Sequence, residues 1–390
     1  MLTTSYHPEK GLDIETILKA GIATLDLTDK QHEKAVKEYK AIAAHLAAHK
    51  NFFEKHFPDI YPQGSMDLGT CLRPFGRIEF DLDIVVVMYG SGYMTLEETM
   101  NELGNALKGF PTGNVTIERL DRCFRVNYPG DFHIDLLPAR PDASPSNPTA
   151  IKLPDCKSLR WGSSDPKSFK GFFEEAKARI IVEAREFETV INAKKADVAP
   201  PPTKTTIRDK TALQFSIQIL KRHRDLYFSN RKDATSSAII TSLASQAYLG
   251  HQHIEQAVSS ILARMGSFVR PEKSRVPNPR YSQEDYADRW TSIPPHREVA
   301  FWEWLHKAKV DFAGIADLKL RSVINSLEPI LGKEAATSAL NIFDSEGISK
   351  LRASGSLALN KTTGFLGAAT ALGTIPVKGT SFFGNEPFEL

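Results

Sequence analysis

The sequence has few cysteines, and they form no pattern that a metal site or a redox motif uses. Cys71, Cys123 and Cys156 are odd in number and lie far apart in the 390-residue chain. Zinc and redox motifs need closely spaced cysteines or histidines, and secreted disulfide frameworks need an even set. We therefore expect free thiols, a reducing compartment and no bound zinc.

Long apolar runs are also missing, and neither sign of charge is in excess. No stretch reaches the length of about 20 residues that a membrane-spanning helix needs, and the N-terminus, MLTTSYHPEKG, has no signal-peptide pattern. The 49 basic residues nearly balance the 47 acidic ones, so the chain as a whole is not drawn to nucleic acid or membranes. These absences predict a cytoplasmic protein without a membrane partner.

What the sequence does contain is an apolar strand that begins with two carboxylates. Asp81 and Asp83 precede a run of isoleucine and valine. Residues two apart in a strand share a face, so these side chains project together. Neighbouring carboxylates repel each other unless a proton or a cation lies between them. A divalent metal site explains the pair, although an exposed strand end alone can also carry such a pattern.

A Gly-Ser turn precedes this strand. Gly64 and Ser65 lie in the segment YPQGSMDLGT, and a turn of this kind that leads into a helix offers N–H groups and a hydroxyl to phosphate. Gly-Ser pairs are also common in ordinary turns. The combination of this turn with the two carboxylates is what predicts chemistry on a nucleoside triphosphate.

A third acid lies in a separate apolar strand. Asp135 belongs to DFHIDLLPA, which we expect to end at Pro138. An unpaired carboxylate inside an apolar strand is costly to bury. We therefore predict that Asp135 faces the same metals as Asp81 and Asp83, on a neighbouring strand. His133 shares its face and is interpreted as a packing or orienting residue.

Helical periodicity marks most of the remaining chain. Thr28 and Gln31 fit a capping box, and apolar residues at helical spacing continue to Pro58, which predicts one long amphipathic helix. Asp165 and Pro166 are typical of a helix start. We further expect helices at 95–108, 211–228, from 236, and at 251–265, 297–309, 316–331 and 333–344, strands at 115–120, 123–128 and 131–137, and a loop-like stretch at 138–164.

Changes in composition and in apolar periodicity divide the chain into three parts. Strands and the long helix fill residues 1–160, and helices dominate residues 161–350. Residues 351–390 are rich in glycine, carry few charges and show no sustained period. We predict a catalytic core, a helical domain and a mobile tail or extended arm.

These segments together resemble the nucleotidyltransferase superfamily of poly(A) polymerases and CCA-adding enzymes. Within it they are most similar to the cyclic GMP-AMP synthase and DncV-like nucleotidyltransferases (CD-NTases), the bacterial oligonucleotide cyclases of anti-phage (CBASS) systems. GSMDLGT, DLDIVV and HIDLLPA match the superfamily motif, and RWGSSDPKSF and VPNPRYSQEDYADRW match segments of the helical half. IQILKRHRD and SSAIITSLA resemble the helices that reach the donor triphosphate.

The resemblance implies an α+β fold of two lobes. The first lobe would be a polymerase beta-like mixed sheet with a long N-terminal spine helix, and the second a C-terminal helical domain. It also implies two Mg²⁺ ions, with Mn²⁺ able to replace them. Asp81 and Asp83 would bind both ions, and Asp135 would complete the second site.

The phosphate contacts are implied in the same way. Gly64 and Ser65 would hold the β- and γ-phosphates, while Lys221 and Ser237, together with Ser236, would fix the donor triphosphate. Taken alone, Lys221 is typical of a solvated helix residue, and Ser237 of an N-cap.

The implied activity joins ATP, with GTP or a pyrimidine nucleotide beside it, into a cyclic di- or trinucleotide second messenger. A template-independent terminal transferase acting on RNA or protein would share the site but favours a stronger basic groove. A nucleotide-binding scaffold without activity is the third hypothesis. No Cys/His cluster matches the zinc insertion of DNA-activated relatives, so no nucleic-acid activator is expected, and the tail is predicted to recruit a regulatory protein.

Overall fold

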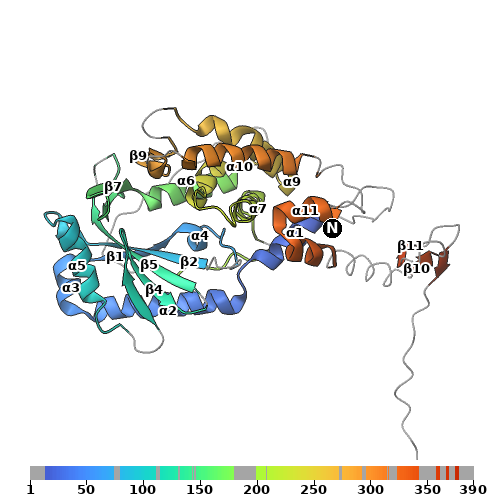
Figure 1. Cartoon of the computed structure of the whole chain (residues 1–390). Helices are drawn as coiled ribbons and strands as arrows, with labels where there is room; N and C mark the ends of the chain where they lie inside the picture. Colours follow the sequence, from blue (N-terminus) through green and yellow to red (C-terminus); the bar gives the residue numbers. More distant parts are fainter. Residues whose placement is uncertain are drawn as a thin grey trace, which may run out of the picture.

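The computed structural model describes most of the chain in two lobes (Figure 1). One lobe is built on a sheet and the other on helices, so the fold is of the α+β class. The described residues are 14–73, 80–110, 115–130, 132–142, 144, 146–179, 199–207, 209–271, 275–291, 296–313, 315, 323–341, 357–360, 366–368 and 374–376.

A seven-stranded mixed sheet forms the first lobe. Its strands follow the order β1-β2-β5-β4-β3, and β6 continues from β5 to β7. β2 and β5 run parallel, and the other neighbours run antiparallel. The strands are β1 (Asp59–Gln63), β2 (Phe80–Val87), β3 (Thr116–Arg119), β4 (Phe124–Tyr128), β5 (Phe132–Pro141), β6 (Ile151–Asp155) and β7 (Arg160–Ser164).

Alternation along β2 decides which face carries the carboxylates. Leu82 and Ile84 point into a core that α2 (Asp29–Ala48) and α5 (Leu96–Ala106) cover. Asp81 and Asp83 therefore lie on the other face, because successive side chains of a strand point to opposite sides. That face turns towards the helical lobe (Figure 1).

The long helix expected from Thr28 to Pro58 is in fact two helices. α2 begins with the predicted capping box, in which the Thr28 side chain accepts from the backbone of Gln31. It ends at His49, whose Nδ1 accepts from the Phe52 N–H at 3.3 Å and so starts α3 (Lys50–His56). A local side-chain cap competes with helix continuation at this position.

Two further expectations in the sheet lobe were wrong. The stretch predicted as a loop at 138–164 contains β6 and β7, which pair as a hairpin. β5 does not end at Pro138 but runs to Pro141. Pro138 stays opposite Val86 in the ladder with β2, while on its other edge β5 has left β4 after Leu136 and joins β6 only at Arg140.

The helical lobe has its own apolar core, to which the N-terminal helix also contributes. α1 (Ile14–Leu25), which we did not predict from the sequence, buries Ile17 and Ile22 against this core. The predicted cap residues Asp165 and Ser236 begin α6 and α8. The remaining elements here are α6 (Pro166–Ala178), α7 (Ala212–Tyr227), α8 (Ser237–Ala247), α9 (Ile254–Arg264), η2 (Met265–Phe268), β8 (Pro277–Asn278), β9 (Tyr281–Asp285), η3 (Asp288–Thr291), α10 (His296–Phe312) and α11 (Val323–Leu331), followed by helical residues 333–341.

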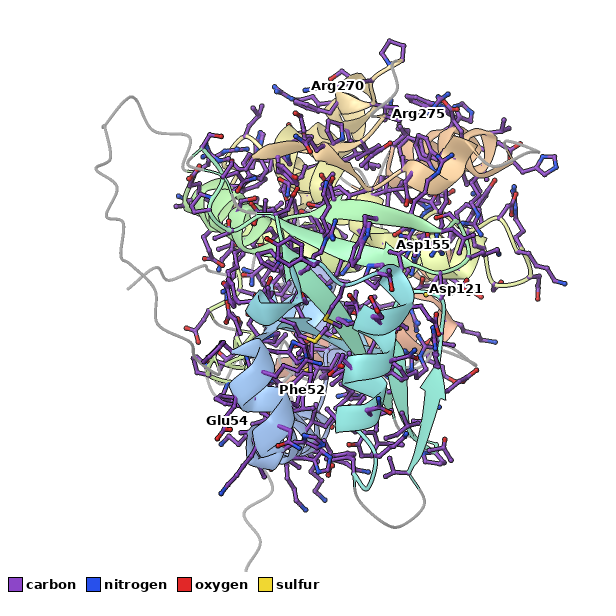
Figure 2. All side chains as sticks on the ribbon, turned by 90° about the vertical axis from the view of Figure 1, so that its left-hand side faces the viewer. Phe52, Glu54, Asp121, Asp155, Arg270 and Arg275 are labelled. Carbon is purple, nitrogen blue, oxygen red and sulfur yellow. The ribbon has the colours of Figure 1, made fainter. Side chains whose placement is uncertain are left out.

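Arg122 ties the two lobes together beside the sheet. Its guanidinium donates to Asp155 of β6 at 2.6 Å and to Asp288 of η3 at 2.8 Å. Figure 2 shows Asp155 between the end of the molecule that carries Phe52 and the end that carries Arg270 and Arg275. This bridge fixes the sheet against the helices at the rim of the space between them.

Near the C-terminus, three short strands lie within the segment that we predicted to be a mobile tail or extended arm. β10 (Leu357–Asn360) pairs with β11 (Leu366–Ala368) and with β12 (Thr374–Pro376) in a separate three-stranded sheet. The other residues of 351–390 lie outside the described part, and the proposed domain limits at 160 and 350 stay predictions. Within the described residues, no helix combines the length and apolar character needed to cross a membrane.

Candidate active site

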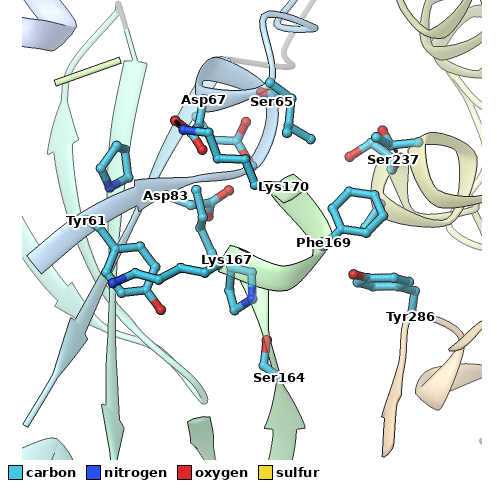
Figure 3. A pocket seen from close by; sticks show the side chains of 18 of the residues that line it. Tyr61, Ser65, Asp67, Asp83, Ser164, Lys167, Phe169, Lys170, Ser237 and Tyr286 are labelled. Atoms are coloured by element: carbon cyan, nitrogen blue, oxygen red, sulfur yellow. Dashed lines mark hydrogen bonds and ion pairs between the residues drawn. The ribbon is translucent and has the colours of Figure 1, made fainter. Parts of the chain in front are cut away.

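A cavity of about 420 Å³ lies where the two lobes face each other. Ligand sites for small molecules typically have volumes of roughly 300–1,000 Å³, so a nucleotide is a suitable occupant. The sheet lobe contributes β1, the single helical turn α4 (Gly64–Asp67) and β2, while α6, α7, α8 and β9 contribute from the other side. Figure 3 shows this arrangement of side chains.

Asp81 and Asp83 both line the cavity, as predicted. Among the described residues, neither carboxylate has an ion-pair partner. Burial, followed by the charges of Asp81 and Asp135, raises the pKa of Asp83 well above its ordinary value. Holding these carboxylates together without a cation therefore costs free energy.

The register between β1 and β2 places the Gly-Ser turn directly against the carboxylate pair. Gln63 lies opposite Asp83, so the next residue, Gly64, begins α4 beside that side chain. Gly64 has φ +74°, and an added Cβ would lie 2.5 Å from Oδ2 of Asp83. Glycine is required here both by the backbone conformation and by the close approach.

Replacing Gly64 with alanine should lower the rate of nucleotide joining by about ten- to a hundredfold, because the new methyl group displaces Asp83 from a site where sub-ångström placement matters. Steady-state kinetics would measure this. Gly130 also has a positive φ, of 77°, but a Cβ there meets nothing within 4 Å. G130A is therefore the matched control for backbone strain, and equal losses in the two variants would contradict the contact with Asp83.

Asp135 lies next to Asp83 but does not line the cavity. The parallel pairing of β2 with β5 puts Asp83 and Asp135 directly opposite each other, so the prediction of neighbouring strands is confirmed. However, Arg125 of β4 holds the Asp135 carboxylate through two hydrogen bonds, of 2.7 and 2.6 Å. Its role as a metal ligand stays a prediction.

Lys221 reaches the cavity from α7 and is almost fully buried. Its ammonium donates to Oγ1 of Thr70 at 3.1 Å and to the Thr70 carbonyl at 3.3 Å. Thr70 ends the GSMDLGT segment, so the lysine is held by the turn that carries Gly64. Burial lowers the pKa of Lys221 to about 8.

This pKa gives a pH dependence with a definite sign. Lys221 is charged below about pH 8 and loses its charge above it, so the KM for the triphosphate should rise as the pH increases through this value. Initial rates between pH 6.5 and 9.5 would show the rise. A K221M variant, which has no ammonium to titrate, should lack it, and an equal rise in K221M would exclude Lys221 as its source.

The two predicted serines of α8 have different surroundings. Ser236 is the N-cap, and its hydroxyl accepts from the Ala238 N–H at 3.2 Å. Ser237 is the first helical residue and lines the cavity, where Figure 3 shows it near Phe169. The N-terminus of α8 thus faces the site, an arrangement that favours phosphate. The capping role that was open for Ser237 belongs to Ser236.

Sequence reasoning missed the wall that α6 and β9 supply. Lys167, Phe169 and Lys170 of α6 and Tyr286 line the cavity, and the rings of Phe169 and Tyr286 meet edge to face at 5.6 Å. Lys170 pairs with Asp67 of α4 at 2.7 Å. The lysines at positions three apart in a helix with a known start could have indicated this polar face.

A buried carboxylate fixes this wall. Glu284 of β9 accepts from Oγ of Ser164 at 2.6 Å, from the Asp165 N–H at 3.0 Å and from Nδ2 of Asn278 at 2.7 Å. Two segments singled out by the resemblance, SSDP and NPRYSQE, therefore meet at one residue. Their shared function is to hold the start of α6, and with it Lys167, against the cavity.

The residues at the site fit a divalent cation, which prefers carboxylate oxygens. Asp81 and Asp83 share a face, repel each other and lie across from the Gly64 turn. In the described part of the chain, no three Asp, Glu, His or Cys side chains stand in a metal-holding arrangement. Asp135, the predicted third ligand, is bonded to Arg125 through both of its oxygens.

Comparisons with known proteins agree with this geometry. A family model described as the Second Messenger Oligonucleotide or Dinucleotide Synthetase domain matches residues 14–176. The chain is 28% identical over 355 residues to a c-di-GMP synthase of Roseivirga ehrenbergii, across 89% of this chain and 91% of that protein. It is 24% identical over 399 residues to the cyclic dinucleotide synthase CdnG of Bradyrhizobium diazoefficiens, across 96% and 95%.

Solved structures show the same fold. The structure of CdnG from Bradyrhizobium diazoefficiens with GTP matches with a TM-score of 0.67 at 19% identity, covering 85% of this chain and 99% of that one. The Vibrio cholerae di-nucleotide cyclase DncV with ATP and GTP matches with a TM-score of 0.61 at 13% identity, covering 85% and 98%.

The fold and the paired carboxylates facing a Gly-Ser turn define a nucleotidyltransferase. Within that class, the chain is similar to the CD-NTases: the second-messenger synthetase model matches residues 14–176, and both relatives are named cyclic dinucleotide synthases. The comparisons agree with the resemblance drawn from the sequence motifs.

Proposed function

We propose that this chain joins nucleoside triphosphates into a cyclic dinucleotide, with GTP among its substrates. The observation that carries the proposal is one cavity in which Asp81 and Asp83, two carboxylates with no ion-pair partner in the described part of the chain, lie with Gly64, Ser65 and Lys221. The names of two relatives, a c-di-GMP synthase and a cyclic dinucleotide synthase, support the product class.

The proposed reaction is two successive phosphoryl transfers. In the first, a ribose hydroxyl oxygen of one nucleotide forms a bond to the α-phosphorus of another, the bond to the departing pyrophosphate breaks and the hydroxyl proton is released. In the second, a hydroxyl of the second nucleotide attacks the α-phosphorus still present on the first, which closes the ring and releases a second pyrophosphate. The other substrate is proposed to be ATP or a pyrimidine nucleoside triphosphate.

The chain's own groups position the triphosphate for this attack. Bound Mg²⁺ would lower the pKa of the attacking hydroxyl and neutralise the departing oxygens. Asp81 and Asp83 would hold it, and Asp135 would complete the second site and accept the proton. The ammonium of Lys221 and the hydroxyls of Ser65 and Ser237 donate hydrogen bonds to phosphate oxygens, which favours in-line geometry.

Incubating the purified protein with the four NTPs and Mg²⁺, with and without RNA, tests this function. A small product that resists phosphatase and forms without RNA is expected, because a closed ring has no terminal phosphate. Extension of added RNA with no small product would instead identify a terminal transferase. Binding of nucleotide without pyrophosphate release would identify an inactive scaffold.

We further propose that the product is a second messenger in anti-phage defence and that the protein acts in the cytoplasm. The description of the matching family model, which names second-messenger synthesis, supports the signalling role. Bacteria carrying the wild-type gene in its natural neighbourhood should resist phage better than bacteria carrying an Asp83→Asn version. Equal plaque counts would contradict the defence role and leave the chemistry untouched.

The C-terminal segment is proposed as a docking point for a regulatory protein. The separate sheet of β10, β11 and β12 supports this, because Figure 1 shows it apart from both lobes. A CdnC structure with a HORMA protein shows that a protein of the same fold assembles with a partner. Deleting residues 355–390 should remove partner capture and leave NTP turnover; unchanged capture would contradict the proposal.

A further inference from the structure

Arg125 and Asp135 form a tightly matched pair beside the catalytic strand. They are directly opposite in the antiparallel pairing of β4 with β5. Nε of Arg125 donates to Oδ1 of Asp135 at 2.7 Å, and Nη2 donates to Oδ2 at 2.6 Å. Two parallel, charge-assisted hydrogen bonds are the strongest arrangement that these groups form. The hydrogen bond to Asp135 also raises the pKa of Arg125.

Asp135 therefore lies between two neighbours of opposite charge. On one side, β2 places Asp83 directly opposite it, and on the other side β4 places Arg125 opposite it. Asp81 and Asp83 open onto the cavity, whereas Asp135 is only 8% exposed and is not part of the cavity wall. Both oxygens of the carboxylate are thus bonded to the guanidinium.

We propose that Arg125 is a clasp that competes with the second metal ion for Asp135 and thereby sets the metal concentration at which the site fills. This inference rests on the proposed function. The clasp keeps the third carboxylate away from Asp81 and Asp83 until a divalent ion outcompetes the guanidinium. Arg125 acts through Asp135, so it is a positioning residue.

The opposite role for Arg125 is chemically reasonable and makes the opposite prediction. A carboxylate has about four lone-pair sites, so an arginine can orient it while a metal binds the remaining ones. An orienting arginine strengthens metal binding, and a clasp weakens it. The position of Asp135 outside the cavity wall, with both oxygens bonded to Arg125, favours the clasp.

Manganese binding without nucleotide tests the clasp independently of turnover. Free Mn²⁺ can be counted by electron paramagnetic resonance while the full-length protein is titrated, and the thermal midpoint can be followed against Mn²⁺ concentration. An R125K variant keeps the positive charge but loses the fork-shaped pair of donors. We expect half-saturation of the second site at an Mn²⁺ concentration about tenfold lower, equivalent to about 1.4 kcal/mol.

Two further variants separate the clasp from simple charge effects. R125A removes both the charge and the fork, and it should bind Mn²⁺ at least as tightly as R125K. Arg119 also holds a carboxylate with two nitrogens, Nη1 and Nη2, which donate to Glu97 outside the cavity wall, so R119K is the matched control and should leave Mn²⁺ binding unchanged. If R125A bound Mn²⁺ more tightly than the wild-type protein but R125K did not, the effect of Arg125 would come from its charge alone. That result would overturn the clasp.

The outcomes also distinguish this inference from the proposed function. Unchanged or weaker Mn²⁺ binding in R125K, while D83N abolishes binding, would overturn the clasp and leave the metal site in place. If the wild-type protein and D83N responded equally to Mn²⁺ and no product formed from NTPs, the proposed function itself would fail. Thermal unfolding of R125K without metal verifies that each comparison uses folded protein.

Discussion

An Asp83→Asn variant is expected to join nucleotides at least about a thousandfold more slowly than the wild-type chain, while its fold becomes more stable. The loss follows from removing a metal-holding oxygen, since about 4 kcal/mol of transition-state stabilisation corresponds to a factor of a thousand. The gain follows because burial and the charges of Asp81 and Asp135 raise the pKa of Asp83, which means that its ionised form is disfavoured in the folded protein.

The pH dependence of the unfolding free energy tests the sign of this stability effect. Its folded pKa lies above the unfolded value of 3.8, so the folded state binds the extra proton and stability falls as the pH rises from 3.8 towards the folded pKa. Thermal unfolding of D83N should lack this fall. Calorimetry and product assays on the same preparations would measure both effects.

Asp233 offers a matched control for the same substitution. It pairs with Arg231 at 2.7 Å on a loop outside the cavity wall, and that pairing lowers the pKa of Asp233. D233N should therefore keep full activity and gain no stability. A D83N protein that retained turnover, or that lost both activity and fold, would contradict a metal-holding carboxylate at position 83.

A Lys221→Met variant is expected to lose about a hundredfold in kcat/KM, because removing one preorganised charged donor from a dry site costs this much in comparable cases. Its stability should hold or rise. The folded pKa of Lys221, about 8, lies below the ordinary value of 10.5, so burying the charged form opposes folding. The stability that the wild-type chain gains between pH 8 and 10.5 should be absent in K221M.

Lys167 provides the comparison for Lys221. It lines the same cavity, but its ammonium is already paired with Asp59 at 2.6 Å and lies 4.1 Å from the ring centroid of Tyr61. K167M should therefore cost less in kcat/KM than K221M. If K221M lowered kcat/KM no more than K167M did, the proposed contact between Lys221 of α7 and the triphosphate would be contradicted.

The strand of Asp81 and Asp83 could be predicted from the sequence because alternation along a strand itself determines which side chains share a face. A period of two places Asp81 and Asp83 on one face, and the burial of Leu82 and Ile84 on the other face confirms it. Likewise, an acid in an apolar strand requires a nearby partner, and Asp135 proved to be opposite Asp83. Helix caps such as Asp165 could also be predicted, because a cap contacts residues only a few positions away in the sequence.

The remaining parts depend on contacts between distant segments, which no local pattern encodes. Arg125 looks like an ordinary strand residue until the pairing of β4 with β5 sets it against Asp135. The contact of Glu284 with Asp165 spans 119 positions, so the sequence showed both segments without showing that they meet. The division of the expected long helix also depended on one side chain, His49, which caps the second helix.

Anomalous diffraction from crystals grown with Mn²⁺ and a non-hydrolysable GTP analogue tests the central claim most directly. The account predicts manganese peaks bound by oxygens of Asp81 and Asp83, with the triphosphate in contact with Ser65 and the ammonium of Lys221. Manganese bound elsewhere, or a triphosphate that lies away from the Gly64 turn, would contradict the assignment of this cavity as the site of nucleotide joining.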